Sequence, residues 1–207
     1  RVIEVVTGRP YAEAVDRLVF QPAGMRRMRL GCSLREACAP DEVCYYHHTP
    51  DELANCVFPD VEDRVPWPYG GFYLEAMDSH GGWIGSAIDL LRFVTAVDGS
   101  RGEPLLAPES LAAMTARPAP PVAVDKPTYY GLGWNIRPVG DDANWWHGGS
   151  LPGTMTLLVR TSSRSENRGR LDGLAWAALF NLRPHEREKF REVLDKQLWH
   201  AAREVTE

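Results

Sequence analysis

Apolar side chains recur at helical spacing near the start of the chain. In residues 10–20, Ala14, Val15, Leu18 and Val19 fall on one face of a helix. The segment that follows contains the breakers proline and glycine. The pattern therefore predicts an amphipathic helix over residues 10–20.

Two further segments combine a helical apolar pattern with a start signal. Residues 86–98 begin with Ser86, a good N-cap, and an acidic residue follows three positions later. Residues 107–114 have Pro108 in what would be the first turn. We expect a helix in each segment.

The second half of the chain has a strand-like pattern. Residues 129–137, 153–161 and 174–182 are rich in apolar and aromatic positions, and two of these runs are almost continuously apolar. Polar residues between the last two predict a hairpin loop. A charged amphipathic segment at 184–205 predicts a closing helix.

These elements predict an α/β (α+β) fold, in which an antiparallel sheet is covered by helices. We expect residues 129–137, 145–161 and 173–182 to form the sheet, with the helix at 184–205 on one face. Residues 26–79 contain five prolines between short apolar runs. The expected division is a helical and irregular lobe over 1–118 and a sheet domain over 119–207.

Composition excludes several classes of function. The 207-residue chain has a net charge of −5 with scattered basic residues, which is not a nucleic-acid signature. No apolar run reaches the roughly 20 residues of a membrane span, and nothing indicates a cofactor. The chain opens without Met inside a helix-like run, so we expect a segment upstream of residue 1. Any export signal would lie there, which leaves the compartment open, with the cytoplasm favoured.

All four cysteines fall in one short stretch that also holds two histidines: Cys32, Cys38, Cys44, Cys56, His47 and His48. No Cys-x-x-Cys pair is present and the spacing fits no common zinc pattern. A two-bridge disulfide arrangement remains an alternative for an exported protein. Reduced, structurally incidental thiols are favoured, and no metal site is predicted.

Four segments, taken in order, resemble one family of enzymes. They are VIEVVTGRPYAEAVDRLVFQPAGMRRMRLG at residues 2–31, HGGWIGSAIDLLRF at 80–93, YGLGW at 130–134 and WWHGGSLPG at 145–153. Together they resemble the serine β-lactamase-like hydrolases: class C β-lactamases, D-alanyl-D-alanine carboxypeptidases and related carboxylesterases. The resemblance implies a partial β-lactamase/transpeptidase-like fold.

The last segment is similar to the family's third catalytic element, Lys-Thr-Gly or His-Thr-Gly. His147, Gly148 and Gly149 occupy its three positions, and Ser150 comes next. The resemblance implies that the Ser150 backbone N–H is an oxyanion-hole donor. The glycines would let an acyl substrate approach the strand; alternatively, they only permit close packing near Trp145 and Trp146.

His147 departs from the commoner lysine of this element. Lysine would supply a permanent charge for a substrate carboxylate, whereas histidine changes its charge in the physiological pH range. We therefore expect weaker recognition of carboxylates, which favours ester or amide substrates that lack one. A purely structural role for this histidine is the alternative.

The nucleophile of such a hydrolase is missing from these residues. The family needs Ser-x-x-Lys, but the residues three positions before the three lysines are Ala123, Glu186 and Val193. No Tyr-x-Asn occurs, and Ser165-Glu166-Asn167 lies in the polar loop. We predict that the chain alone is inactive and that it is the C-terminal part of a hydrolase acting on an ester, amide or β-lactam.

Ser150 does not replace that nucleophile. An elbow of the form Gly-x-Ser-x-Gly would need glycine at 152, which is proline. Asp89 and His147 could complete a catalytic triad with Ser150, but nothing in the sequence brings these residues together. The expected partners are therefore a small-molecule or peptide substrate and the missing N-terminal segment or a second chain.

A non-catalytic pseudoenzyme or binding module is the alternative function. It would use the same cleft, lined by aromatic residues drawn from Tyr69, Tyr73, Trp83, Trp134 and Trp146, although most of these fit a core equally well.

Overall fold

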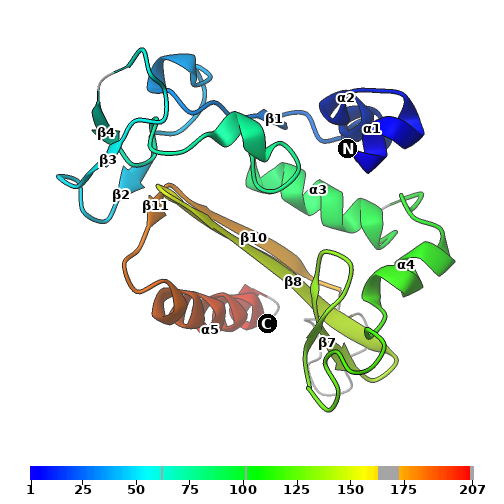
Figure 1. Cartoon of the computed structure of the whole chain (residues 1–207). Helices are drawn as coiled ribbons and strands as arrows, with labels where there is room; N and C mark the ends of the chain where they lie inside the picture. Colours follow the sequence, from blue (N-terminus) through cyan, green and yellow to red (C-terminus); the bar gives the residue numbers. More distant parts are fainter. Residues whose placement is uncertain (62, 101, 163–172, 206–207) are drawn as a thin grey trace. The chain divides into compact units, whose positions relative to one another are not determined.

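The computed structural model describes residues 1–61, 63–100, 102–162 and 173–205. Its helices are α1 (Val2–Thr7), α2 (Tyr11–Val15), the π-helix η1 (Asp16–Phe20), the short 3₁₀ helices η2 (Arg35–Ala37) and η3 (Leu74–Met77), α3 (Ala87–Val97), α4 (Pro108–Thr115) and α5 (Arg187–Val205) (Figure 1). In this part of the chain, no helix has both the length and the apolar character needed to cross a bilayer.

The strands of the main sheet follow the order β10-β9-β8-β7-β6. They are β6 (Tyr129–Tyr130), β7 (Asn135–Val139), β8 (Asp142–Leu151), β9 (Thr154–Arg160) and β10 (Ala175–Phe180). The predicted antiparallel sheet is confirmed. Its three predicted segments give five strands because turns at Gly133 and Gly153, both with positive φ, divide the first two.

Three short strand pairs lie outside this sheet. Two are antiparallel, β1 (Arg29–Leu30) with β5 (Trp83–Ile84) and β3 (Leu53–Asn55) with β4 (Arg64–Pro66); one is parallel, β2 (Tyr46–His47) with β11 (Leu182–Arg183). Residues 26–79 were expected to be irregular. They contain the four short strands β1 to β4, which the sequence did not reveal because two or three paired residues leave too weak a pattern to detect.

The chain forms two compact units. One comprises Arg1–Leu90, Gly149–Thr156 and Leu179–His185, and the other comprises Leu91–Gly148, Leu157–Ala178 and Glu186–Glu207. Each is described below by its own contacts.

In the first unit, the predicted helix over residues 10–20 changes its period halfway. The N–H of Gln21 donates to the carbonyl of Asp16 at 2.8 Å, a π-helical turn. A hydrogen bond to the fifth residue back, instead of the fourth, widens the turn and rotates the later side chains away from the expected face. Leu18 is therefore 60% exposed, whereas Phe20 is buried and meets the Trp83 ring edge-on at 4.8 Å. The prediction that Leu18 shares the buried face was wrong.

A fully buried carboxylate, Asp89, fixes the start of α3. The Ser86 hydroxyl donates to it at 2.8 Å and accepts the Asp89 backbone N–H at 3.1 Å, which confirms Ser86 as the N-cap. Asp89 also accepts the backbone N–H groups of Arg26 and Arg27, at 3.0 and 3.1 Å. One side chain thus caps a helix and holds a remote loop.

Glu75 likewise holds backbone in place through its carboxylate, here in the irregular segment. Its carboxylate accepts the Ser33 backbone N–H at 2.8 Å and also the Ser33 hydroxyl, while that hydroxyl accepts the N–H of Leu74. Burial opposes ionisation, but the hydrogen bonds from Ser33 outweigh it and lower the pKa of Glu75. Polar contacts therefore replace regular secondary structure here.

In the second unit, an aromatic core covers one face of the sheet. Ile136 and Trp145 are buried at 0% and 3% exposure, and the Trp145 and Trp134 rings lie 5.9 Å apart. Trp134 also stacks on Phe93 of α3, with ring centroids 6.2 Å apart. The predicted C-terminal helix exists as α5, which contacts the sheet through the Trp176–Trp199 ring pair at 4.9 Å.

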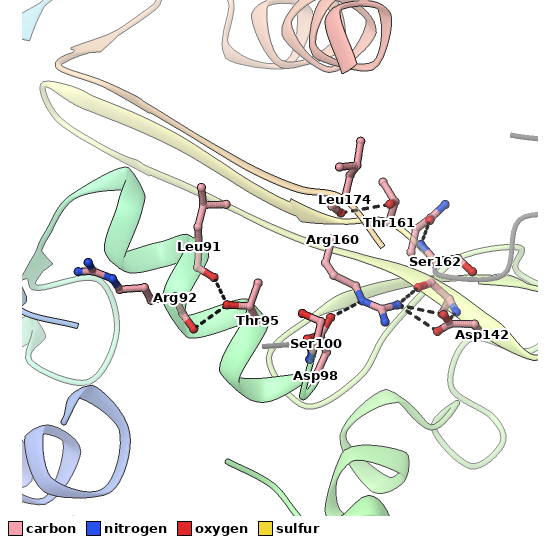
Figure 2. A network of polar contacts seen from close by, with 12 residues as sticks. Leu91, Arg92, Thr95, Asp98, Ser100, Asp142, Arg160, Thr161, Ser162 and Leu174 are labelled. Atoms are coloured by element: carbon pink, nitrogen blue, oxygen red, sulfur yellow. Dashed lines mark hydrogen bonds and ion pairs between the residues drawn. The ribbon is translucent and has the colours of Figure 1, made fainter. Parts of the chain in front are cut away.

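A buried arginine ties the end of α3 to two strands (Figure 2). Arg160 Nε donates to Asp98 Oδ2 at 2.9 Å, and its Nη1 donates to both Asp142 carboxylate oxygens at 3.1 and 3.2 Å. The guanidinium also lies 4.6 Å from the centre of the Trp145 ring. The Arg160 and Asp98 side chains are only 9% and 3% exposed, so the charges depend on each other.

In the β8–β9 hairpin, Gly149 lies directly against Thr156. A Cβ at position 149 would lie 2.5 Å from Thr156 Oγ1 but 3.8 Å from Thr156 Cβ. The first distance is a clash and the second an ordinary contact. The missing side chain is therefore required by the neighbouring strand.

We predict that Asp98→Asn lowers the free energy of unfolding by about 3 kcal/mol, because it leaves the buried Arg160 charge with half its compensation. Urea denaturation measures this. The control is Glu186→Gln, which removes the exposed ion pair with Lys189 and should leave the midpoint unchanged. Equal effects of the two variants would contradict the importance of the buried network.

We predict that Gly149→Ala destabilises the protein by about 1–3 kcal/mol through overpacking against Thr156. Thr156→Ala removes the clashing hydroxyl, so the double variant should be more stable than expected from the sum of the two single changes. A double-mutant cycle measures this coupling. Strict additivity would show that another contact demands the glycine.

Candidate active-site strand

The two tryptophans that precede the glycines of β8 point to opposite faces of the sheet. Trp145 is buried in the aromatic core, while the next residue, Trp146, lines a cavity under α5. This alternation is the ordinary period of a strand. The adjacent bulky residues therefore serve two different surfaces, and His147 comes next as an exposed residue.

The second half of β8 extends beyond its neighbour β7. Their pairing runs from Asp142 opposite Val139 to Trp146 opposite Asn135, the first residue of β7. Asn135 also donates from its side-chain amide to the Trp146 carbonyl at 3.3 Å. Residues 147–151 thus continue past the end of the β7 ladder, and the predicted site residues all lie in this extension.

His147 contacts a tyrosine from the edge strand β6. Its Nε2 lies 2.9 Å from the Tyr130 hydroxyl, and the two rings meet edge-on at 5.9 Å. Tyr130 pairs with Asn135 of β7, so its ring reaches across the end of β7. Both side chains are exposed, and the imidazole is therefore held by a polar contact rather than by burial.

The next three residues, Gly148, Gly149 and Ser150, are all partly exposed. At Gly149, close packing explains the missing side chain, but the residue packed against it is Thr156 rather than Trp145 or Trp146. The Ser150 hydroxyl oxygen is buried and has no hydrogen-bond partner in the part of the chain that the structure describes. A strand of this kind offers backbone N–H groups and small side chains, which suits a donor for a developing oxyanion.

Asp89 is not free for a catalytic role. Its carboxylate caps α3 and holds the backbone of Arg26 and Arg27, as described above. Asp89 is therefore not available to form a catalytic triad with His147. Ser165-Glu166-Asn167, the formal Ser-x-Asn match, lies outside the described residues.

The cysteine-rich stretch has no metal-binding arrangement. All four cysteines are free, and within the described ranges no group of three or more histidine, cysteine or acidic side chains could hold a metal ion. Burial raises the pKa of the Cys38 thiol, which favours its unreactive form. His47 contacts Thr49 at 2.9 Å and stacks on Trp67.

The aromatic residues considered for a cleft have unrelated surroundings. Tyr69 and Trp134 are core residues at 6% and 4% exposure, Trp83 packs on Phe20, and Tyr73 is 55% exposed. These side chains have different partners and exposures, so they give no support to a shared aromatic cleft.

A cavity of about 410 Å³ lies between α5 and the sheet in the second unit. Its lining is Arg137, Asn144, Trp146, Leu157, Val159, Glu188, Arg191, Glu192, Asp195 and Trp199. Burial raises the pKa of Asp195, and Arg137 and Trp199 oppose that rise. No sequence pattern indicated this cavity, because most of its polar lining comes from a helix that looks merely charged and amphipathic.

Sequence reasoning also missed the Tyr130–His147 contact. Tyr130 was noted as part of YGLGW, but nothing in that segment specifies the partner of its hydroxyl. The register of the β6–β7–β8 ladder brings the two residues together, and register depends on turns whose exact positions the pattern did not give.

Comparison with known proteins identifies the family of this chain. The Beta-lactamase family profile matches residues 1–198. No curated protein matches the chain. Among solved structures, D-amino acid amidase from Ochrobactrum anthropi SV3, in complex with D-phenylalanine, is 20% identical with a TM-score of 0.63, and the match covers 96% of this chain and 57% of that one.

Two other solved structures match at similar levels. D-stereospecific amidohydrolase from Streptomyces sp. is 23% identical with a TM-score of 0.58, over 87% of this chain and 46% of that one. The octameric penicillin-binding protein homologue from Pyrococcus abyssi is 20% identical with a TM-score of 0.55, over 87% and 35%. The chain thus spans between about a third and just over half of these proteins.

These likenesses show a shared fold, and the family profile covers nearly the whole chain. The extended end of β8 lies within that matched region. By its fold and by this match, the chain belongs to the β-lactamase family.

Proposed function

We propose that this chain supplies the substrate-binding strand of a serine hydrolase that cleaves a small amide or ester through an acyl-enzyme. The observation that carries the proposal is the end of β8, where His147, Gly148, Gly149 and Ser150 extend past β7. The nucleophile and base come from a segment outside these residues, since the 207-residue sequence contains no Ser-x-x-Lys.

The chemistry assigned to the strand is positioning and charge stabilisation. A serine hydroxyl from the other segment attacks the substrate carbonyl carbon, and its proton passes to the leaving amine or alcohol as the old bond breaks. The Ser150 backbone N–H stabilises the oxyanion that forms in between, a contribution of about 3 kcal/mol for one such donor. Water then hydrolyses the acyl-enzyme.

The residue at position 147 favours substrates without a carboxylate beside the scissile bond. Histidine provides no permanent positive charge there. The two amide-cleaving relatives are named for acting on D-amino acid amides and as a D-stereospecific amidohydrolase. An amino acid amide has its carboxylate masked as the amide, which suits a side chain without a permanent positive charge. We therefore propose an amino acid amide or a related ester as the substrate class.

We predict that the 207-residue chain alone hydrolyses p-nitrophenyl esters, amino acid p-nitroanilides and nitrocefin no faster than the uncatalysed background. Adding the segment with the nucleophile, fused or as a separate chain, should restore turnover. Ser150→Ala in the active form should retain most of that turnover, because the variant keeps its backbone N–H. Turnover by the chain alone that Ser150→Ala abolishes would overturn the proposal. Ligand binding without turnover in the completed protein would favour the pseudoenzyme.

We predict that a permanent positive charge at position 147 favours carboxylate-bearing substrates. His147→Lys should raise the ratio of kcat/KM for a carboxylate substrate to that for a matched neutral ester by several-fold, about 1 kcal/mol for a partly screened ion pair.

His147→Ala is the control for this prediction, because it adds no charge and should not raise the ratio. A ratio that His147→Lys leaves unchanged would show that the side chain at position 147 does not meet the substrate.

A further inference from the structure

The contact between Tyr130 and His147 has the properties of a positioning interaction. The Tyr130 hydroxyl lies 2.9 Å from Nε2 of the imidazole, within the range of a good hydrogen bond. Tyr130 is 51% exposed, so its hydroxyl does not need this partner to offset burial. No other hydrogen bond to the His147 ring is formed within the described part of the chain.

The two groups have unequal hydrogen-bonding capacities. A phenol hydroxyl can donate or accept, whereas each nitrogen of a neutral imidazole has only one role, and one nitrogen donates while the other accepts. When the Tyr130 hydroxyl donates, Nε2 is the acceptor and the proton of the ring must be on Nδ1. The bond on one nitrogen thereby determines the chemistry of the other.

We propose that Tyr130 is a positioning residue that holds neutral His147 as its Nδ1–H tautomer, so that His147 donates a hydrogen bond to an acceptor oxygen of the ligand. The identity of the ligand rests on the proposed function, whereas the assignment of the tautomer does not. The Nδ1–H would then bind a carbonyl oxygen or, with less affinity than a lysine would, a carboxylate oxygen at this position. It would disfavour an ammonium group there, which has no lone pair to accept the N–H.

The chain offers a matched control for this role. Tyr129 is the adjacent residue of the same strand, and its hydroxyl donates to the Thr115 carbonyl at 2.9 Å. Tyr129→Phe therefore removes an equivalent hydroxyl whose hydrogen bond only supports the fold. Tyr130→Phe removes only the contact to His147. Any general effect of removing a hydroxyl from β6 will appear in both variants.

The first measurement is the tautomer of His147 by NMR in protein labelled with ¹⁵N-histidine, with His147→Asn to assign the signals. At a pH where the ring is neutral, the unmodified protein and Tyr129→Phe should show the proton on Nδ1. Tyr130→Phe should shift the ring towards the tautomer mixture of an exposed histidine. A proton on Nε2 in the unmodified protein, or no change in Tyr130→Phe, would overturn the assignment.

The second measurement uses phenylacetate and phenethylamine as competitive inhibitors of the active protein, because they share a ring and differ in the polar group. Phenylacetate should bind more tightly. Tyr130→Phe should weaken phenylacetate by up to about tenfold, the value of one hydrogen bond, and leave phenethylamine unchanged. Tyr129→Phe should change neither.

The two measurements separate the inference from the proposed function. The Nδ1–H tautomer with no inhibition by either compound would overturn the proposed substrate site and leave the Tyr130 assignment standing. Equal weakening of both compounds by Tyr130→Phe would show that Tyr130 only supports the strand, which overturns the specificity role.

Discussion

The guanidinium of Arg160 is the contact on which the second unit depends. It joins β9 to Asp142 at the start of β8 and to Asp98 just after α3, and it lies over the Trp145 ring. Taking this cation out of water is costly, and only the full set of partners compensates for it. The strand ends and the helix end therefore stabilise one another in this arrangement.

The strand β8 transmits that arrangement to the candidate site. Its first half pairs with β7 and anchors Arg160 through Asp142, while its second half runs free of β7 and presents His147. Because alternate residues of a strand face opposite sides, a slip of one position would exchange the faces of Trp145 and Trp146. The position of His147 is thus set by core packing several residues away.

The sequence was sufficient for the sheet, the closing helix and the helix beginning at Ser86, since each has a strong period or a cap with a physical cause. It was insufficient where a contact between distant residues decides the outcome. The π-turn after Asp16, the clash of a Cβ at 149 with Thr156, and the Tyr130–His147 bond all depend on neighbours brought by the fold. Similarly, HGGS could be located as a motif, but its position beyond β7 required the register.

The aromatic core of the second unit has an optical consequence. Trp134, which immediately precedes β7, and Trp145 of β8 have ring centroids 5.9 Å apart and planes inclined at 57°. Two indoles this close and not parallel share their excited states, and such coupling gives circular dichroism bands of opposite sign. The Trp176–Trp199 pair of the same unit, with centroids 4.9 Å apart and planes inclined at 86°, contributes in the same way. The bands weaken when either pair of rings separates, so they report whether the aromatic packing of the second unit is intact, independent of any substrate.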